Sequence, residues 1–136
     1  MTYRITPGQI RKTNRQMIYD FIYKGRKVSQ QDIAYSLRLS RPTVTSNLCE
    51  MEAERLVSKN GLLDSDQIGR KATAYSIVPD SRVAVGVKVT SRAAKVIAID
   101  LYGEKIDRIV LERPFEDQDS YYREISEGIS KFIASL

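Results

Sequence analysis

Residues 29–55 read SQQDIAYSLRLSRPTVTSNLCEMEAER, and this stretch decides the fold of the first half of the chain. Its apolar residues recur at helical spacing in two blocks, which the short connection Leu39-Ser40 separates. Ser29 and Ser40 stand where helix N-caps are expected, and Pro42 favours the first helical turn that follows. The pattern predicts a helix of about two turns from Ser29 and a longer helix from Ser40 to about Arg55. Two helices joined by a short turn form a helix-turn-helix unit.

The longer of these helices has a polar surface suited to reading DNA. With Val44 and Leu48 turned inward, the other side chains of its first two turns are expected on or near the outer surface. That end of a recognition helix enters the major groove, where Arg pairs with guanine, Asn pairs with adenine, and hydroxyl groups reach phosphates. The alternative interpretation is a solvated polar helix face. The candidate DNA contacts on this helix are Arg41, Pro42, Thr43, Thr45, Ser46 and Asn47.

A further helix is predicted upstream, from Gln9 to Tyr23, after the N-cap and N1 pair Thr6-Pro7 and before Gly25. Arg11 and Arg15 on this helix are candidate contacts to DNA phosphates. The apolar stripe expected to face the core consists of Ile10, Met17, Ile18, Phe21 and Ile22.

A hairpin is predicted after the helices. Residues 56–59 and 74–78 are strand-like, and the segment between them, NGLLDSDQIGRKAT, is polar and rich in glycine and charge. This loop fits the wing of a winged helix, with Gly69-Arg70-Lys71 at its tip. Gly69 lets the backbone approach the narrow minor groove while Arg70 inserts along it, and Lys71 adds a second cation. The alternative is a solvated charged loop.

Charge is distributed unevenly along the 136 residues. Residues 1–78 hold 13 Lys plus Arg against 7 Asp plus Glu, a net charge of +6, whereas residues 79–136 hold 9 against 10, a net charge of −1. A compact basic segment attracts polyanions through phosphate neutralisation and counterion release. Nucleic acid, as double-stranded DNA, is the expected partner, and an anionic membrane surface is the less common alternative.

Composition excludes several classes of protein. No run approaches the roughly 18 apolar residues of a membrane span, and the polar start lacks the apolar region of a secretory signal, so a cytoplasmic protein is expected. With one cysteine and no histidine, the chain has no intramolecular disulfide, no His-containing zinc site and no His-based catalysis. Cys49 is interpreted as an ordinary, partly buried thiol next to Leu48 on a helix, and the acids Asp100, Glu104 and Asp107 as solvated. No catalytic residue, metal or cofactor is assigned, and the chain is not expected to be an enzyme.

The second half predicts three strands and a helix. The runs 83–89, 93–100 and 104–112 fit a β-meander, and Gly103 in the turn between the last two suits a positive φ. A helix is predicted from about Ser120, with Ile125, Ile129, Phe132, Ile133 and Leu136 on one face. The fold class is therefore α+β, with a winged helix-turn-helix domain over residues 1–79 and a partial ribonuclease-H-like β-β-β-α half-lobe over residues 80–136.

Three stretches carry a family resemblance. They are IRKTNRQMIYDFI at 10–22, LSRPTVTSNLCEMEAERLV at 39–57 and IGRKATAYSIVPDSRVAVGVKV at 68–89. From Gln9 to Leu111 the chain resembles the N-terminal part of the ROK family (repressors, open reading frames, kinases), on its branch of xylose- and N-acetylglucosamine-type repressors. The resemblance implies sequence-specific repression of sugar-utilisation genes, with DNA contacts at the recognition helix and at Gly69-Arg70.

Two departures from the family pattern limit what the resemblance implies. ROK kinases open their second domain with an Asp-x-Gly-x-Thr loop for Mg²⁺ and ATP, but here Lys88 occupies the Asp position and Thr90 the Gly position. Lys88 cannot ligate Mg²⁺ and Thr90 crowds the phosphate approach, which argues against a sugar-kinase-like enzyme. Family repressors also continue through a large domain with the sugar site and a Cys/His zinc site. This chain ends at Leu136, so a sugar effector is not expected.

The first two strands of the second half are almost continuously apolar, a pattern typical of a sheet covered on both faces, yet only one further helix follows. One face or edge is therefore expected to be left over, so this half is expected to self-associate, to dock on the winged helix, or to be a piece of a longer protein. Of these, we expect a homodimer through residues 80–136, which would suit a palindromic operator. The alternative is a small domain whose own helices cover the sheet. Besides the leading interpretation of a repressor, an accessory protein that heterodimerises with a full-length ROK repressor, or a non-functional fragment of one, stays open.

Overall fold

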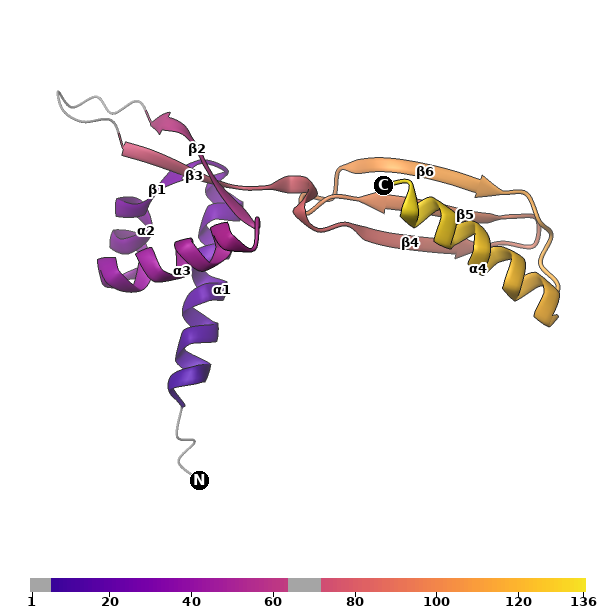
Figure 1. The fold of residues 1–136 in the computed structure, drawn as a ribbon, viewed down its shortest axis with the longest axis horizontal. Coiled ribbons are helices and arrows are strands. Elements are labelled where there is room, and N and C mark those ends of the chain that lie inside the picture. Colours follow the sequence, from indigo (N-terminus) through magenta and orange to yellow (C-terminus); the bar gives the residue numbers. More distant parts are fainter. Residues whose placement is uncertain (1–5, 64–71) are drawn as a thin grey trace. The chain divides into compact units, whose positions relative to one another are not determined.

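The computed structural model describes residues 6–63 and 72–136 and divides the chain into two compact units, Met1–Val78 and Pro79–Leu136. Figure 1 shows the elements of each unit. The predicted division lay one residue further along, between residues 79 and 80. Each unit has its own sheet and its own helices, so each is described by itself.

Three helices and a three-stranded antiparallel sheet make up the first unit. The sheet order is β1-β3-β2, so the short β1 adds itself to the hairpin of the two longer strands. The sequence pattern did not indicate β1, because two residues are too short to show an alternation and the strand exists only through the pairing of Val28 with Tyr75. The elements are α1 (Pro7–Gly25), β1 (Val28–Ser29), α2 (Gln30–Leu37), α3 (Arg41–Ala53), β2 (Val57–Leu63) and β3 (Ala72–Ile77).

Local capping sets where the three helices begin, as predicted. The hydroxyls of Thr6 and Ser29 accept hydrogen bonds from backbone amides at the third helical position, and Gln9 and Asp32 complete the two capping boxes. Ser40 likewise accepts from the amide of Thr43 at the start of α3. The end of α3 differs from the prediction: the helix stops at Ala53, because Arg55 takes a φ of 57° and the amide of Leu56 donates to the Met51 carbonyl.

The core of the first unit lies between the second half of α1, the other two helices and the sheet. Ile10 and Met17 are 49% and 39% exposed, so the expectation that both face the core is wrong. The reason is that buried contacts on α1 begin only at Ile18, past the N-terminal part of the helix. The largest fully buried side chains of this unit are Ile18, Ile22, Ile33, Val44, Leu48, Met51 and Val57.

The second unit is a meander of three antiparallel strands in the order β4-β5-β6, followed by a helix. Gly103 in the last turn has a φ of 81°, which confirms the prediction for that position. Thr90 closes the first turn, since its hydroxyl donates to the Ala93 carbonyl at 2.8 Å and accepts from the Ala93 amide at 3.2 Å. The elements are a short 3-10 helix (Pro79–Ser81), β4 (Ala84–Val89), β5 (Ala94–Ile99), β6 (Lys105–Leu111) and α4 (Asp119–Ala134).

Helix α4 covers β5 and β6 on one face of this meander and leaves Val87 and Val89 of β4 exposed. Its side chains Tyr121, Ile125 and Phe132 pack on alternate residues of β5. Gly128 allows the close approach, because a Cβ there would lie 2.7 Å from a methyl carbon of Leu111. Ile133 and Leu136 are 51% and 45% exposed, which contradicts their predicted place on the buried face. Tyr121, one turn before Ile125, is buried on that stripe instead.

The opposite face of the meander is not covered by any residue of this unit that the structure describes. The burial of β5 alternates strictly, with Ala94, Val96 and Ala98 buried while Lys95 and Ile97 are exposed. The expectation that one face is left over is therefore confirmed, and the alternative of full coverage by the unit's own helices is wrong. In the described ranges, no helix has the length and apolar character needed to cross a membrane.

Candidate nucleic-acid interface

The first two turns of α3 present most of the predicted contact residues to solvent. Ser40 caps the helix, and Val44 and Leu48 fix its orientation because both are at most 1% exposed. This leaves Arg41, Pro42, Thr45 and Ser46 exposed, with Thr43 half-buried. A polar helix end of this kind can present hydrogen-bonding groups to a groove of DNA.

Two hydroxyl groups on this surface are already engaged inside the unit. Thr45 Oγ1 donates to the Arg41 carbonyl at 2.9 Å and accepts a hydrogen bond from the side-chain amide of Gln30, which ties α2 to α3. Thr43 Oγ1 lies 2.8 Å from Ser40 Oγ. These bonds hold the side chains in fixed positions, so a DNA base would meet the Thr45 methyl group more readily than its hydroxyl.

Asn47 does not lie on the outer surface. It is 5% exposed, and its Nδ2 donates to the Thr43 carbonyl at 2.8 Å, so the expectation of an outward Asn47 is wrong. The inner stripe of α3 is wider than the apolar pattern indicates, because Asn47 adjoins Leu48 and lies one turn after Val44. Its Oδ1 is buried and has no hydrogen-bond partner among the described residues. Asn47 therefore fits a positioning role within the unit.

Arg41 is the cation that stands at the exposed start of α3. It makes no ion pair with any residue in the described parts of the chain. It lines a polar hollow between the first turn of α2, the start of α3 and strand β3, together with Gln30, Thr73 and Tyr75. A free guanidinium beside a polar hollow can pair with an acceptor-bearing ligand such as a phosphate or the edge of guanine.

Arg11 and Arg15 take a different place from Arg41, because both pair with α3. Arg11 donates to the carboxylate of Glu50, and Arg15 Nη2 lies 2.6 Å from Glu54 Oε2 with Nη1 3.9 Å from Glu50. These ion pairs join α1 to the second half of α3. Each arginine lies 39 residues from its glutamate in the sequence, so no local pattern predicts these ion pairs.

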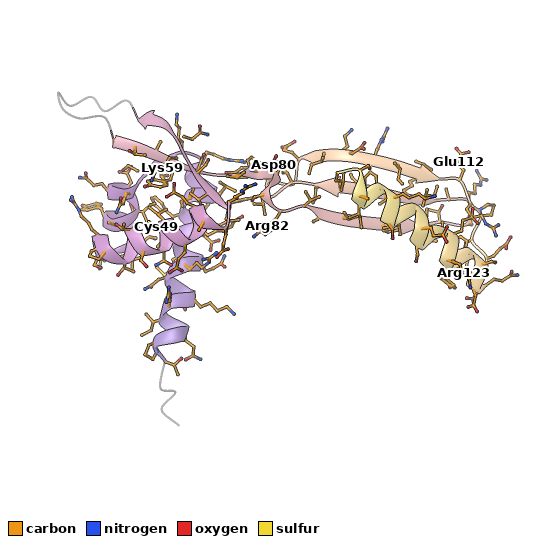
Figure 2. All side chains as sticks on the ribbon, viewed as in Figure 1. Cys49, Lys59, Asp80, Arg82, Glu112 and Arg123 are labelled. Carbon is orange, nitrogen blue, oxygen red and sulfur yellow. The ribbon has the colours of Figure 1, made fainter. Side chains whose placement is uncertain are left out.

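A further ion pair links the end of α3 to the hairpin. Lys59 Nζ on β2 lies 3.4 Å from Glu52. Figure 2 labels Lys59 and also Cys49 of α3, which is exposed, so the expectation of a partly buried thiol is wrong. The charge interactions with Tyr75 and with Glu52 raise the pKa of Lys59. Burial raises the pKa of Tyr75, against a smaller lowering effect of Lys59. The C-terminal half of α3 is thus anchored by charge on both sides.

The predicted wing tip lies outside the described residues. Gly69, Arg70 and Lys71 fall between β2 and β3, whose pairing is irregular between Lys59 and Leu62, where Gly61 has a φ of 75°. The structure describes the two strands that would carry the wing. The contact predicted for its tip stays a prediction.

Metal-ligating side chains do not gather in the described parts of either unit. No group of three or more Cys, Asp or Glu side chains there could hold a metal ion. Lys88 is exposed on β4, and Thr90 closes a turn with its own hydrogen bonds.

Comparison with known proteins gives a likeness of fold. No family model and no curated protein matches the sequence. A solved structure of a ROK family transcriptional regulator, described as a homologue of the E. coli Mlc protein, superposes with a TM-score of 0.67 and 19% sequence identity. The match covers 93% of this chain and 33% of the regulator, so this chain spans about a third of that protein's length. The chain has a partial ROK-like fold.

Proposed function

We propose that this chain is a sequence-specific DNA-binding transcriptional regulator that inserts the N-terminal end of α3 into the major groove. The observation that carries the proposal is the state of Arg41, an exposed guanidinium on the first turn of a capped helix without an ion pair in the described residues. Around it, Pro42, Thr45 and Ser46 are exposed and uncharged, so no carboxylate of this surface would repel the phosphates. Thr43 adds a half-buried contact at its edge.

Two further observations support this function. The net charge of +6 over residues 1–78 favours binding to a polyanion. The likeness to the ROK family regulator favours a regulatory protein over an enzyme. We propose that Gly69, Arg70 and Lys71 form a wing that contacts the adjacent minor groove, in line with the strands that flank them.

The finer parts of the proposal concern assembly and biological role. We propose a homodimer through residues 80–136, because two recognition helices related by a two-fold axis fit a palindromic operator. A repressor of sugar-utilisation genes is the role that the family resemblance favours. No sugar effector is proposed for this chain, whose match leaves two thirds of the similar regulator uncovered.

Selection from a random duplex library tests this function. The purified chain is incubated with the library at two salt concentrations, the bound fraction is sequenced, and light scattering reports the mass of the complex. We expect an enriched palindromic motif bound by a dimer. Weak, salt-sensitive binding by a monomer without any enriched motif would contradict the proposal and favour an accessory protein that pairs with a full-length regulator.

The variant Arg41→Ala tests in the same assay whether Arg41 recognises a DNA base. It should relax the base preference at one position and cost about 1–3 kcal/mol of affinity there. Lys24→Ala is the matched control, because Lys24 is an exposed cation in the last turn of α1, more than two turns beyond Arg15. Equal base preference in wild type and Arg41→Ala would show that another surface reads the DNA.

A further inference from the structure

The uncovered face of the second unit combines cations with apolar side chains. Because strand residues alternate between faces, the register places Gly86, Lys88 and their cross-strand neighbours on the side opposite α4, where Ala84 and Ile99 continue the face beyond them. We call Gly86, Lys88 and these neighbours the open face, and all six residues line one shallow hollow. They are Gly86 and Lys88 of β4, Lys95 and Ile97 of β5, and Arg108 and Val110 of β6.

The three cations of the open face are not neutralised within the unit. Lys88 and Lys95 are directly opposite each other on paired strands, an arrangement in which like charges destabilise a sheet. Neither of them, nor Arg108, makes an ion pair with a residue in the described part of this unit. By contrast, Arg113 beyond the end of β6 pairs with both Glu116 and Glu124.

The acidic residues of this unit lie elsewhere. Residues 79–136 carry a net charge of −1, so the positive open face is balanced by acids outside it. Most of them follow β6, in the segment that leads into α4 and on α4 itself. The open face therefore attracts a negatively charged partner, and the cross-strand lysine pair is relieved when one binds.

The open face is also apolar between its cations. Ile97 and Val110 are 41% and 50% exposed, and Gly86, opposite Ile97, leaves room beside it. On the other side, α4 covers β5 and β6 with a stripe of apolar side chains, while Val87 and Val89 of β4 stay 44% and 48% exposed. A second helix laid on the open face would complete the same helix-on-sheet layering.

We propose that the open face binds an acidic amphipathic helix of another polypeptide, whose apolar stripe covers Ile97 and Val110 and whose carboxylates pair with Lys88, Lys95 and Arg108. Two other occupants fit less well. A second copy packed face to face would place like charges against each other, so the homodimer proposed above is expected through an edge strand of the sheet and not through this face. Single-stranded nucleic acid would lack the aromatic stacking platform that such sheets provide, since none of the six residues is aromatic.

Selection from a peptide library tests the proposal on the full chain. The library contains peptides of about 18 residues, which form helices of about 27 Å, with a fixed leucine stripe and flanking positions varied among Glu, Gln, Lys and Ser. We expect peptides bound by the wild type to be enriched in Glu at the flanks. The enriched peptide should lose about tenfold or more in affinity for Lys95→Glu/Arg108→Glu.

The matched control is Arg123→Glu/Lys131→Glu, which makes the same change of charge on exposed positions of α4, where Figure 2 labels Arg123. It should bind the peptide like the wild type, and this shows that net charge alone is not responsible. Flanks without an acidic excess, or equal affinity for both double variants, would overturn the proposal. So would a change from dimer to monomer in Lys95→Glu/Arg108→Glu, or competition by single-stranded DNA that this variant abolishes, because either would assign the face to a different occupant.

Discussion

The two ends of α3 carry opposite kinds of side chain. At the N-terminal end, Arg41 is unpaired within the described residues, and the exposed side chains around it are uncharged. At the C-terminal end, Glu50, Glu52 and Glu54 pair with cations from α1 and β2. One helix thus separates a surface available to a ligand from a surface that fixes the helix in the unit.

This difference shows which cations of the first unit are left to bind a ligand. Its net positive charge is not spread evenly, since Arg11, Arg15 and Lys59 are engaged with the glutamates of α3. The glutamates at the C-terminal end neutralise these three cations, so the N-terminal end keeps the cation, Arg41, that can pair with DNA. The predictions below test this division, starting with the packing that both ends share.

Leu48→Ala should destabilise the whole of α3, including both of its ends. Leu48 is 1% exposed on the inner face of α3, and truncation of a buried leucine costs about 2–5 kcal/mol of the free energy of unfolding. The neighbouring Cys49 is exposed, so Cys49→Ala should change stability by less than about 0.5 kcal/mol. Chemical denaturation with amide hydrogen exchange, which separates residues of the two units, measures both. A stable Leu48→Ala chain would show that α3 is not held by this core.

Asn47→Ala tests whether Asn47 stabilises the N-terminal end of α3 or contacts a DNA base. It removes the buried hydrogen bond to the Thr43 carbonyl and should cost about 1–3 kcal/mol of stability while leaving the base preference unchanged. Ser46→Ala next to it is the control, because Ser46 is exposed and its loss should leave stability unchanged. A changed base preference in Asn47→Ala, with stability intact, would restore Asn47 as a base contact.

How far the sequence predicts this region depends on the range of the interactions. The starts of the helices at Thr6, Ser29 and Ser40 follow from bonds within three residues, and the positive φ of Gly103 follows from its turn. Contacts between distant segments leave no such local pattern. For this reason the two-residue β1 and the pairing of Arg11 and Arg15 with α3 were missed.

Side-chain burial was predicted less well than helix position for a related reason. Periodicity gives the direction of a face but not its width or length. Asn47 is buried because the inner face of α3 is wide, and Ile133 is exposed because the sheet under α4 does not cover it. For the candidate site, the sequence predicted the exposed set around Arg41, whereas the anchored end of α3 required the structure.

The ion pair of Arg15 with Glu54 tests whether the C-terminal end of α3 stabilises the unit without contacting DNA. A double-mutant cycle with Arg15→Ala and Glu54→Gln should give a coupling free energy of about 0.2–1 kcal/mol, because both groups are partly exposed and screened by solvent. DNA affinity should change little, and Lys12→Ala, which removes an exposed cation of α1, is the control. If Arg15→Ala instead lowers the salt dependence of DNA binding by about one unit, Arg15 contacts a phosphate as the sequence predicted.

The smallest effect is expected at Tyr75, which lines the hollow beside Arg41 and also interacts with the charges of Glu52 and Lys59. Burial raises the pKa of the Tyr75 phenol above that of an unfolded tyrosine, about 10, so the folded state disfavours the phenolate. The contribution of Tyr75 to stability should therefore be constant below about pH 10 and fall as the pH rises from there towards the higher pKa of the folded state. Tyr75→Phe removes this ionisation, so its stability should decline less steeply in denaturation experiments above pH 10 than that of the wild type. If wild type and Tyr75→Phe lose stability equally above pH 10, the Tyr75 phenol is accessible to water and burial does not disfavour its ionisation.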